Sequence, residues 1–567
     1  MSKTWSVSKN APDNYKKQFK GFDDIVVQML YNRLIKNKKE AEEFFNPDYK
    51  KMHDPYLLKD MGKAVKRIIK SLEKKEKITV FGDYDVDGIT STAIVFDVLK
   101  KLNANVDFYI PHRNKEGYGI NKDAIDLLAK EKTNLLITVD NGISNKNEIL
   151  YAKKKGIEVV LTDHHEVPKI IPDAIAVVNP KQKDDKYPFK NLSGVGVAFK
   201  LVCALVSEVN KKNKKELMPL EQLKWYLDLV ALGTISDIVP LLGENRIIAF
   251  FGLIVLAKTK NVGLKALEKI AGIDLEKGSP HMIGFQIGPR LNAAGRMAHA
   301  KSALDLILAE DENEAGVLAL KLERLNQERQ NTISDVVNGL KVELAKNKLE
   351  NILILRNEDW TAGIIGLIAG KISDEFSRPV FCMAEEAGII KGSVRSSVDF
   401  NVVESLSVFE EILINYGGHY GAGGFSLKEE NFNVFQEQLL DWGRKELKEN
   451  DLKAKLDIEK EIELKDINFQ FLEQIKRFAP FGHSNPEPLF LTKGVLIKEA
   501  KKVGKESNHT KLRLFKDDME FSAILFNHGE MGEQLIFGNK IDIVYKIEEN
   551  EWSGNKKLEL KIEDLRS

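Results

Sequence analysis

The chain is poor in several features that mark specialised classes of protein. It has only two cysteines among 567 residues, Cys203 and Cys382, which excludes a disulfide framework and a cysteine-rich zinc module. Its 85 basic and 85 acidic side chains cancel, so any binding of nucleic acid depends on a local patch and not on a global positive field. The longest apolar run, AFFGLIVLA at residues 249–257, is too short to cross a bilayer.

These absences favour a cytoplasmic protein with no membrane segment. The opening MSKTWSVSKN lacks the apolar core of a signal peptide, and two distant cysteines suit a reducing compartment. Hydrophobic content of 43% and charged content of 30% are typical of globular proteins. Because 567 residues are too many for one core, we expect two to four domains.

Short apolar segments alternate with amphipathic segments in the first half of the chain. KITVF, NLLITV and IEVVLT are predicted strands, whereas TSTAIVFDVLKKL and NKDAIDLLAKE are predicted helices. This βαβα alternation is typical of a doubly wound parallel sheet in an α/β protein. We therefore expect such a domain at residues 61–258, after an N-terminal extension at residues 1–60 whose role the sequence does not indicate.

The second half of the chain changes pattern twice. Residues 312–348 keep a helical period, so residues 259–348 are expected to form a helical region with a long connecting helix. A second α/β domain is expected at residues 349–448. From residue 455 to 567, segments such as TKLRLFKDD, FSAILFN and KIDIVYKIEE predict short strands separated by turns, and hence a small β-barrel.

The segment VFGDYDVDG places three carboxylates directly after an apolar strand. Asp83, Asp85 and Asp87 alternate with other residues, and Gly88 follows. An EF-hand loop has this spacing, but it needs a glutamate at its twelfth position, where this chain has Ile94, and the flank here is a strand. The remaining interpretations are a metal site at the carboxyl end of a parallel strand and an ordinary solvated acidic turn.

Further acidic and imidazole groups follow other apolar segments. Asp140 ends NLLITVD, the triplet Asp163, His164 and His165 ends IEVVLTDHH, and Asp237 follows YLDLVALGTIS. If these segments end at one sheet edge, the side chains converge, and crowded carboxylates cannot all stay ionised without cations. Carboxylate and imidazole donors suit Mn²⁺, Mg²⁺ or Zn²⁺, and a pair of such ions is the usual apparatus for hydrolysing phosphate esters.

The motifs GDYDVDG, VDNG, TDHH and ISD together resemble the DHH phosphoesterase superfamily, named after the triplet at residues 163–165. The resemblance implies two divalent ions, Mn²⁺ or Mg²⁺, with Asp85 on one ion, Asp87 on the other and Asp140 bridging. Phe81 stands where some members have a histidine ligand, and Asp83 is the expected substitute. The implied metal ligands are Asp83, Asp85, Asp87, Asp140, His164 and Asp237; with His165, which would contact substrate or orient a ligand, and His419 they form the implied catalytic set.

Additional motifs resemble one family within that superfamily, the RecJ exonucleases. They are PHRNKEGYG (111–119), SGVGVAFKL (193–201), GPRLNAAGRM (288–297), GSVRSS (392–397), GGHYGAGGFS (417–426) and RFAPFGHSNPEPLF (477–490). The resemblance runs from about residue 50 to the end of the chain. It implies a DHHA1-type second domain, an OB-fold in the barrel, and 5′→3′ hydrolysis of single-stranded DNA to mononucleotides in recombination and repair.

Several of these motifs supply groups that can bind phosphate. The glycines of GGHYGAGGFS allow close approach of the backbone to a phosphate to which His419 can donate, unless the segment is an ordinary turn. GSVRSS offers an anion-binding arginine or a solvated strand, and GPRLNAAGRM is expected to be a loop. For Arg113 and Arg296 the alternative is an inter-lobe salt bridge. The candidate substrate-binding residues are Arg113, Arg290, Asn292, Arg296, Ser393, Arg395, Ser396, Gly417, Gly418, His419 and, for base stacking, Trp552.

Three functions are open at this point. The first is a metal-dependent 5′→3′ exonuclease on single-stranded DNA. The second is a phosphodiesterase of short oligonucleotides or cyclic dinucleotides, whose members generally lack a C-terminal barrel. The third is a non-catalytic replication scaffold, which would have lost the metal ligands that this chain retains. The expected partners are single-stranded DNA, a helicase and a single-strand-binding protein, and the expected state is a monomer.

Overall fold

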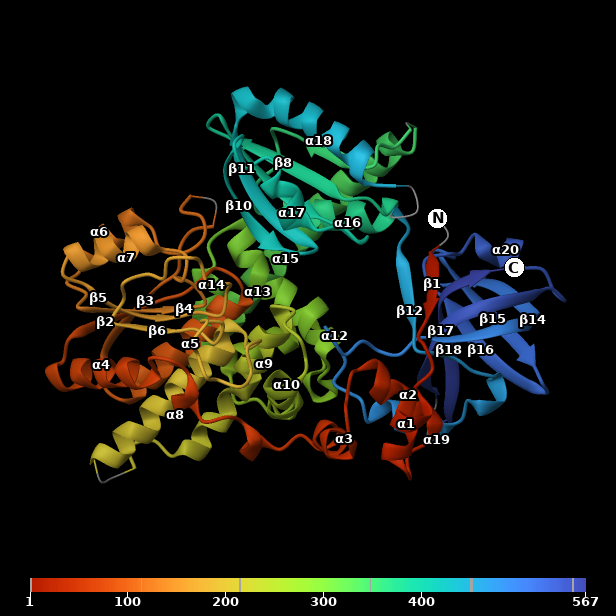
Figure 1. Cartoon of the computed structure of the whole chain (residues 1–567), viewed down its shortest axis with the longest axis horizontal. Helices are drawn as coiled ribbons and strands as arrows, with labels where there is room; N and C mark the ends of the chain where they lie inside the picture. The colour runs from red at the N-terminus through yellow and green to blue at the C-terminus, as the bar shows by residue number, and fades with distance from the viewer. Residues whose placement is uncertain are drawn as a thin grey trace. The chain divides into compact units, whose positions relative to one another are not determined.

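The computed structural model describes residues 3–113, 115–213, 216–346, 348–448, 452–552 and 555–566. The chain divides into two compact units. One unit contains residues 48–452, and the other combines residues 1–47 with residues 453–567. Figure 1 labels many of the helices and strands of both units. Among the described helices, none is both long and apolar enough to cross a membrane.

A five-stranded parallel sheet forms the first part of the larger unit. In spatial order its strands are β3 (Asn105–Tyr109), β2 (Lys77–Phe81), β4 (Leu135–Val139), β5 (Glu158–Thr162) and β6 (Ala176–Val178). One face is covered by α4 (Met61–Lys74), α5 (Val86–Lys101) and α8 (Gly194–Asn213), and the other by α6 (Lys122–Lys130) and α7 (Lys146–Lys154) (Figure 1). The predicted doubly wound parallel sheet is therefore confirmed.

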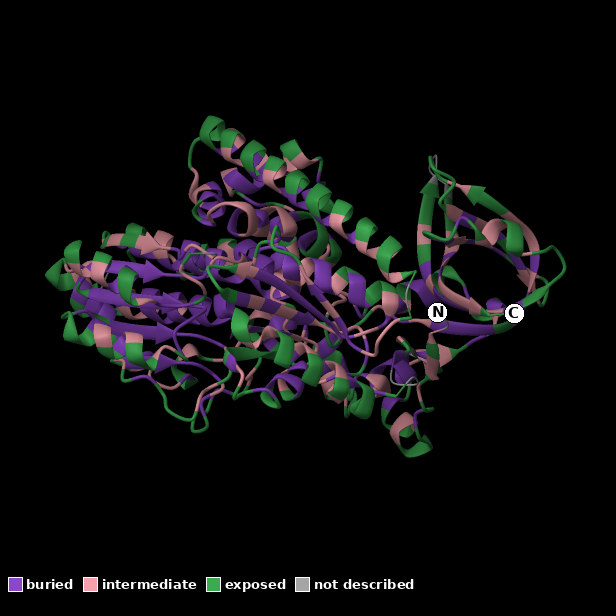
Figure 2. Ribbon diagram, turned by 90° about the horizontal axis from the view of Figure 1, so that it is seen from above, coloured by how far each residue is buried: buried purple, intermediate pink, exposed green. Residues whose placement is uncertain are grey.

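The sheet is buried on both faces, as a parallel sheet requires. Every residue of β4, LLITV, is buried, because helices cover both of its sides. Figure 2 shows this burial along the strands, while the covering helices keep exposed outer faces. The strand order reverses between β2 and β4: the chain goes from β2 outward to β3 and then returns to pair β4 with the other side of β2. Open α/β sheets bind ligands at such a switch point.

Helices continue from the sheet to the second part of this unit. They are α9 (Leu227–Ser236), α10 (Gly243–Leu256), α11 (Val262–Ala271), α12 (Pro280–Met282), α13 (Gly288–Met297), α14 (Lys301–Leu308) and α15 (Glu312–Leu344). Helix α15 contributes Leu322 to the core of the parallel sheet and Ile333 and Val337 to the next core. It is the long connecting helix that the sequence predicts.

The loop predicted for GPRLNAAGRM is wrong, because these residues form α13. Pro289 lies in the first turn of α13, where a helix needs no N–H donor at that position. Leu291 and Ala294 are buried on its inner face. The small side chains that suggested a loop instead allow this helix to pack closely: a Cβ at Gly295 would lie 2.7 Å from the carbonyl oxygen of Tyr84.

A second, mixed sheet follows α15. Its spatial order is β10 (Leu413–His419), β11 (Ala422–Lys428), β9 (Ile389–Arg395), β8 (Val380–Glu386) and β7 (Leu353–Arg356). Only β7 and β8 pair in parallel; the other neighbours are antiparallel. The accompanying helices are α16 (Ile365–Phe376), α17 (Val402–Ser407) and α18 (Phe432–Glu446). The glycine-rich motif forms the β10–β11 hairpin at the edge of this sheet.

The other unit contains the predicted β-barrel. Strands β14 (Phe490–Val503), β15 (His509–Lys516), β16 (Met519–Leu525), β18 (Asn555–Arg566) and β17 (Lys540–Trp552) pair in this order, and β17 pairs with β14 to close the barrel. Shorter elements are β1 (Thr4–Val7), α1 (Asp13–Lys16), α2 (Asp24–Asn32), α3 (Lys38–Phe45), β12 (Lys455–Ile458), β13 (Lys460–Glu461), α19 (Phe469–Lys476) and α20 (Met531–Gln534).

Residues 1–47 pack as a part of the barrel unit, which the sequence pattern did not indicate. Strand β1 pairs in parallel with β12. The buried Arg33 Nη1 lies 2.8 Å from Glu459 Oε1, and its Nε donates to Asn485 Oδ1 at 2.7 Å. Removing one partner of such a buried pair costs about 3–5 kcal/mol, because the other charge is left uncompensated. The N-terminal segment is therefore a structural part of this unit.

Candidate metal centre

The segment between β2 and α5 carries the first three carboxylates. Asp85 caps α5 by accepting a hydrogen bond from the Gly88 N–H at 3.1 Å. Asp83, which precedes the helix, and Asp87, which lies in its first turn, are both buried. Gly88 makes this tight turn possible, since a Cβ there would lie 2.6 Å from the Asp83 backbone nitrogen. The turn thus brings three carboxylates together at the switch point of the sheet.

The N-terminus of α8 holds the Asp87 carboxylate. The N–H of Gly194 donates to Asp87 Oδ2 at 2.7 Å, and the N–H of Val195 donates to Oδ1 at 2.8 Å. Unpaired N–H groups at a helix N-terminus favour negative charge. A Cβ at Gly194 would lie 2.6 Å from the Cβ of Asp140, so the glycine also gives the neighbouring carboxylate its space.

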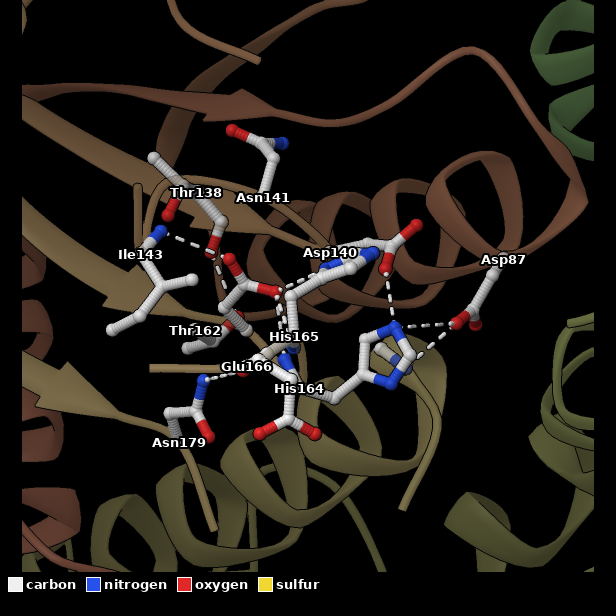
Figure 3. Close-up of polar contacts among 12 residues, drawn as sticks. Asp87, Thr138, Asp140, Asn141, Ile143, Thr162, His164, His165, Glu166 and Asn179 are labelled. Atoms are coloured by element: carbon white, nitrogen blue, oxygen red, sulfur yellow. Dashed lines mark hydrogen bonds and ion pairs between the residues drawn. The ribbon is translucent and has the colours of Figure 1, made fainter. Parts of the chain in front are cut away.

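Asp140, His164 and Asp237 complete the cluster. Asp140 follows β4 with a φ of +62°, a left-handed conformation that aspartate tolerates. Figure 3 shows the His164 ring directed at the carboxylates of Asp140 and Asp87. His164 Nε2 lies 3.2 Å from Asp140 Oδ1, 3.6 Å from Asp237 Oδ2 and 3.8 Å from Asp87 Oδ2. Asp237 reaches this position from the C-cap of helix α9, and not from the end of a strand of the sheet as expected.

Asp163 orients the histidine pair and was not among the predicted site residues. Its carboxylate accepts from the N–H of Ile143 at 2.9 Å and of His164 at 2.7 Å, and lies 2.7 Å from His165 Nδ1. Burial opposes both charges, but the charge of His165 lowers the pKa of Asp163 to about 2, and Asp163 raises the pKa of His165 to about 9. Its place at the head of the TDHH motif is the signal that could have identified it.

Protein cations compensate the metal-centre carboxylates less than His165 compensates Asp163. Burial, followed by repulsion from neighbouring carboxylates, raises the pKa of Asp83, Asp140 and Asp237 well above the usual range. The same two causes raise the pKa of Asp87 to about 7. Burial lowers the pKa of His164 to about 3, so its imidazole is neutral and has a lone pair to offer a metal ion.

The donor atoms fit divalent cations. Asp83 Oδ1, Asp140 Oδ1 and His164 Nε2 are buried and have no hydrogen-bond partner. Within each of three groups, the ligand atoms lie within 4.8 Å of one another: Asp83, Asp85 and Asp140; Asp87, His164 and Asp237; and Asp140, His164 and His165. Oxygen and imidazole donors in overlapping groups are suited to a pair of Mn²⁺ or Mg²⁺ ions. Phe81, by contrast, is buried in the core, where it stacks on Tyr109.

Three of the predicted arginines share a positive region near the cluster. Arg113 lies over the ring of Tyr84, 4.7 Å from its centroid. Burial lowers the pKa of Arg296 to about 9, and the charges of Arg113 and Arg395 act in the same direction. Arg395 Nη1 donates to Ser393 Oγ at 3.0 Å, and its pKa is lowered by burial and by Arg113. Like charges in partly desolvated surroundings favour an anionic ligand.

Four other predicted substrate-binding residues are Arg290, Asn292, Ser396 and Trp552. Arg290 Nε is paired with Glu323 Oε2 at 2.6 Å. Asn292 is half-buried on α13, one turn before Arg296 and on the same face. Ser396 Oγ donates to the Val398 carbonyl at 3.0 Å. The side chain of Trp552 lies outside the described part of the structure.

His419 ends the edge strand β10, which also carries Gly417 and Gly418. Its pKa is lowered by desolvation and then by the positive charges of His165 and Lys181. Lys181 was missed from the sequence; its Nζ lies 2.9 Å from Glu166 Oε1. Gly418 has a φ of +147°, and a Cβ there would clash with the carbonyl of Ala422.

The fold and the donor set define a metal-dependent phosphoesterase of the DHH type. Family models describe residues 77–234 as the N-terminal domain of the DHH family, residues 349–445 as a DHHA1 domain and residues 458–564 as a RecJ OB domain. The chain belongs to the RecJ family of single-stranded-DNA-specific exonucleases, which confirms the predicted family and fold class. The matched ranges lie within the predicted domains 61–258, 349–448 and 455–567.

Curated relatives and a solved structure support this family assignment. The RecJ of Bacillus subtilis (strain 168) is 38% identical over 543 residues, which cover 95% of this chain and 67% of that protein. The RecJ of Haemophilus influenzae is 33% identical over 561 residues, 95% of each chain. The crystal structure of RecJ from Thermus thermophilus in complex with Mn²⁺ matches with a TM-score of 0.84 and 29% identity, covering 100% of this chain and 79% of that one.

Proposed function

We propose that this chain is a metal-dependent exonuclease that hydrolyses single-stranded DNA. The observation that carries the proposal is the overlapping groups of carboxylate and imidazole donors at the switch point of the sheet, in which Asp83 Oδ1, Asp140 Oδ1 and His164 Nε2 have no hydrogen-bond partner. In agreement with it, the curated relatives are named single-stranded-DNA-specific exonucleases, and RecJ of Thermus thermophilus has been solved with Mn²⁺ and with Mg²⁺. When bound, two such ions activate water for attack on phosphorus and stabilise charge on the departing oxygen.

Different side chains would bind the two ions, orient the ligands and contact the substrate. Asp83 and Asp85 would hold one ion, the Asp87, His164 and Asp237 group the other, and Asp140 would lie between them. Asp163 holds the backbone of His164 and the ring of His165 in place through its hydrogen bonds. Such partners fix the orientation of ligands and keep the site ready for metal. His419 would donate a hydrogen bond to the phosphate that is cleaved, where charge develops.

The arginine region gives a physical basis for the direction of cleavage. A terminal 5′-phosphate carries more charge than an internal phosphodiester, and Arg113, Arg296 and Arg395, with Ser393, offer donors for it. With the 5′ end held there, the first phosphodiester would lie at the metal centre. This arrangement supports release of mononucleotides in the 5′→3′ direction.

The remaining assignments extend beyond the site. We propose that the enzyme acts in DNA recombination and repair in the cytoplasm, as a monomer, with a helicase and a single-strand-binding protein supplying and clearing its substrate. Arg290, Asn292, Ser396, Gly417, Gly418 and Trp552 stay predictions as substrate contacts. The closed barrel is the feature that favours DNA over short or cyclic dinucleotides as the substrate, since OB-folds bind single strands.

The test is a product analysis with purified protein in Mn²⁺ or Mg²⁺. Single strands labelled at the 5′ or the 3′ end, duplex DNA, dinucleotides and a cyclic dinucleotide are offered in parallel. We expect mononucleotides from the 5′ end of single strands, no cleavage in EDTA and little cleavage of duplex. Strands with a 5′-hydroxyl should be poorer substrates than those with a 5′-phosphate, and Arg395→Ala should remove this preference. Faster turnover of dinucleotides than of long strands would contradict the proposal.

A further inference from the structure

Ile238 directly follows the metal-centre carboxylate Asp237 and has an unusual backbone conformation. Its φ is +58°, in the left-handed region, where a β-branched residue is a genuine outlier. Its side chain is 68% exposed, so packing inside the protein does little to offset the strain. Glycine or asparagine would adopt this conformation at lower cost. Stability alone therefore does not account for isoleucine at this position.

The end of α9 does not need the isoleucine side chain. Asp237 is the C-cap, and the Ile238 N–H donates to the carbonyl of Ile235 at 3.2 Å. In this type of helix ending the residue after the cap is usually glycine. Pro240 follows two residues later and already prevents the helix from continuing. The turn is thus set by the backbone and the proline, and the apolar side chain needs another explanation.

The surroundings hold Ile238 at the rim of the metal centre. Consecutive Cα atoms are about 3.8 Å apart, so Ile238 adjoins the residue whose Oδ2 lies 3.6 Å from His164 Nε2. Ser236, on the other side of Asp237, packs against α13, since a Cβ at Gly288 would lie 2.9 Å from Ser236 Oγ. Ser236 and Asp237 are therefore held between the cluster and α13, and the exposed Ile238 is the next residue along the chain. A strained residue persists where the surrounding structure holds it, and such residues gather at sites that contact ligands.

We propose that the Ile238 side chain contacts the base of the nucleotide whose phosphodiester lies at the metal centre. The inference rests on the proposed exonuclease function. An aliphatic contact with the face of a base makes no distinction between bases, which suits an enzyme that degrades any sequence. It would also help to place the phosphodiester, because the nucleotide is then held on both its charged and its apolar side.

The test compares wild type with Ile238→Gly and Ile238→Asn. Each is assayed on single strands with a normal or an abasic nucleotide at the 5′ end. On the normal strand we expect KM to rise about 5–10-fold with little change in kcat, in line with the loss of one apolar contact to a base. On the abasic strand, wild type and variants should have the same KM. Relief of the strain should raise the Tm of Ile238→Gly by about 1–2 °C.

Leu34 provides a matched control in the other unit. It has a φ of +57° and is 81% exposed, like Ile238, but it adjoins none of the candidate metal ligands. Leu34→Gly should raise the Tm similarly and leave KM unchanged.

An unchanged KM for Ile238→Gly on the normal strand would overturn the proposal. An equal change on both strands would also overturn it, by assigning Ile238 to the positioning of Asp237. A change seen only with a partner protein present would assign it to protein docking instead. If wild type cleaves neither strand, the proposed function fails separately, and anisotropy of the two strands in Ca²⁺ still decides whether Ile238 contacts the base.

Discussion

The metal centre and the barrel surface use charge in opposite ways. At the metal centre, buried carboxylates face one another and keep donor atoms without partners. On the barrel, a groove of about 900 Å³ is lined by basic residues that have acidic partners nearby: Arg513 Nε donates to Glu520 Oε1 at 2.9 Å, and Lys511 Nζ lies 3.5 Å from Glu559 Oε1. Buried uncompensated charge requires an external partner, whereas exposed pairs require none. The metal centre therefore specifies its ligand more closely than the barrel does.

The largest effect is expected when Asp140, a carboxylate of the metal centre, loses its charge. Asp140→Asn should reduce cleavage by at least about 10³-fold, because the carboxylate that we propose lies between the two ions loses its charge. The metal-free protein should melt at a higher temperature, because one of several repelling carboxylates is gone. Added Mn²⁺ should raise the Tm less than in wild type. These outcomes are measured by cleavage of labelled strands and by thermal unfolding with and without metal.

Asp305→Asn is the control for this change, since Asp305 has an ordinary partner, Lys301 Nζ at 2.7 Å. It should keep wild-type cleavage and the full response to Mn²⁺. Binding of single-stranded DNA to the metal-free Asp140→Asn protein should also be preserved, because the barrel unit is untouched. Metal-dependent turnover by Asp140→Asn would show that Asp140 does not lie between the ions.

The next largest effect is expected at the edge strand of the second sheet. His419→Ala should lower kcat by about 10²-fold with a small change in KM, because a donor to developing charge acts mainly in the transition state. Steady-state kinetics on one strand length separates the two constants. His528→Ala, at an exposed barrel histidine 3.1 Å from Glu530, should change neither. A rise in KM alone would reassign His419 to substrate binding.

A smaller effect tests the contact between α8 and the carboxylates. Gly194→Ala should weaken Mn²⁺ binding about 10–100-fold, because a Cβ there would displace Asp140 and disturb the amides that hold Asp87. Calorimetric titration with Mn²⁺ measures the affinity. Gly196→Ala is the matched change, since its Cβ would lie 3.3 Å from side-chain atoms that can yield. Equal affinities in the two variants would remove the role given to Gly194.

The smallest effect is expected on the barrel. Glu520→Gln should raise affinity for single-stranded DNA about twofold at low salt and steepen the salt dependence, because Arg513 becomes available to a phosphate. Anisotropy titrations at several salt concentrations measure both quantities. Glu310→Gln makes the same change of charge in the other unit, beside Lys100 at 3.0 Å, and should alter neither. An unchanged salt slope for Glu520→Gln would place the DNA away from this face.

The amino-acid sequence was sufficient to predict the parallel sheet, the long helix, the barrel and the types of metal donor. These follow from local properties: apolar strands have a recognisable length and composition, and acidic groups that end such strands meet at one edge of the sheet. Asp237 is the exception, because it follows helix α9. The overlapping donor groups of the structure contain the predicted ligands Asp83, Asp85, Asp87, Asp140, His164 and Asp237.

The way these groups are held depends on contacts between distant parts of the chain. The bond from Gly194 to Asp87 joins residues 107 positions apart, and the pairing of Arg290 with Glu323 depends on how α13 packs against α15. The same is true of Arg33 and Glu459, which join residues 1–47 to the barrel unit. Periodicity and motifs describe neighbours along the chain, whereas these contacts depend on the packing of whole helices, to which many distant residues contribute together.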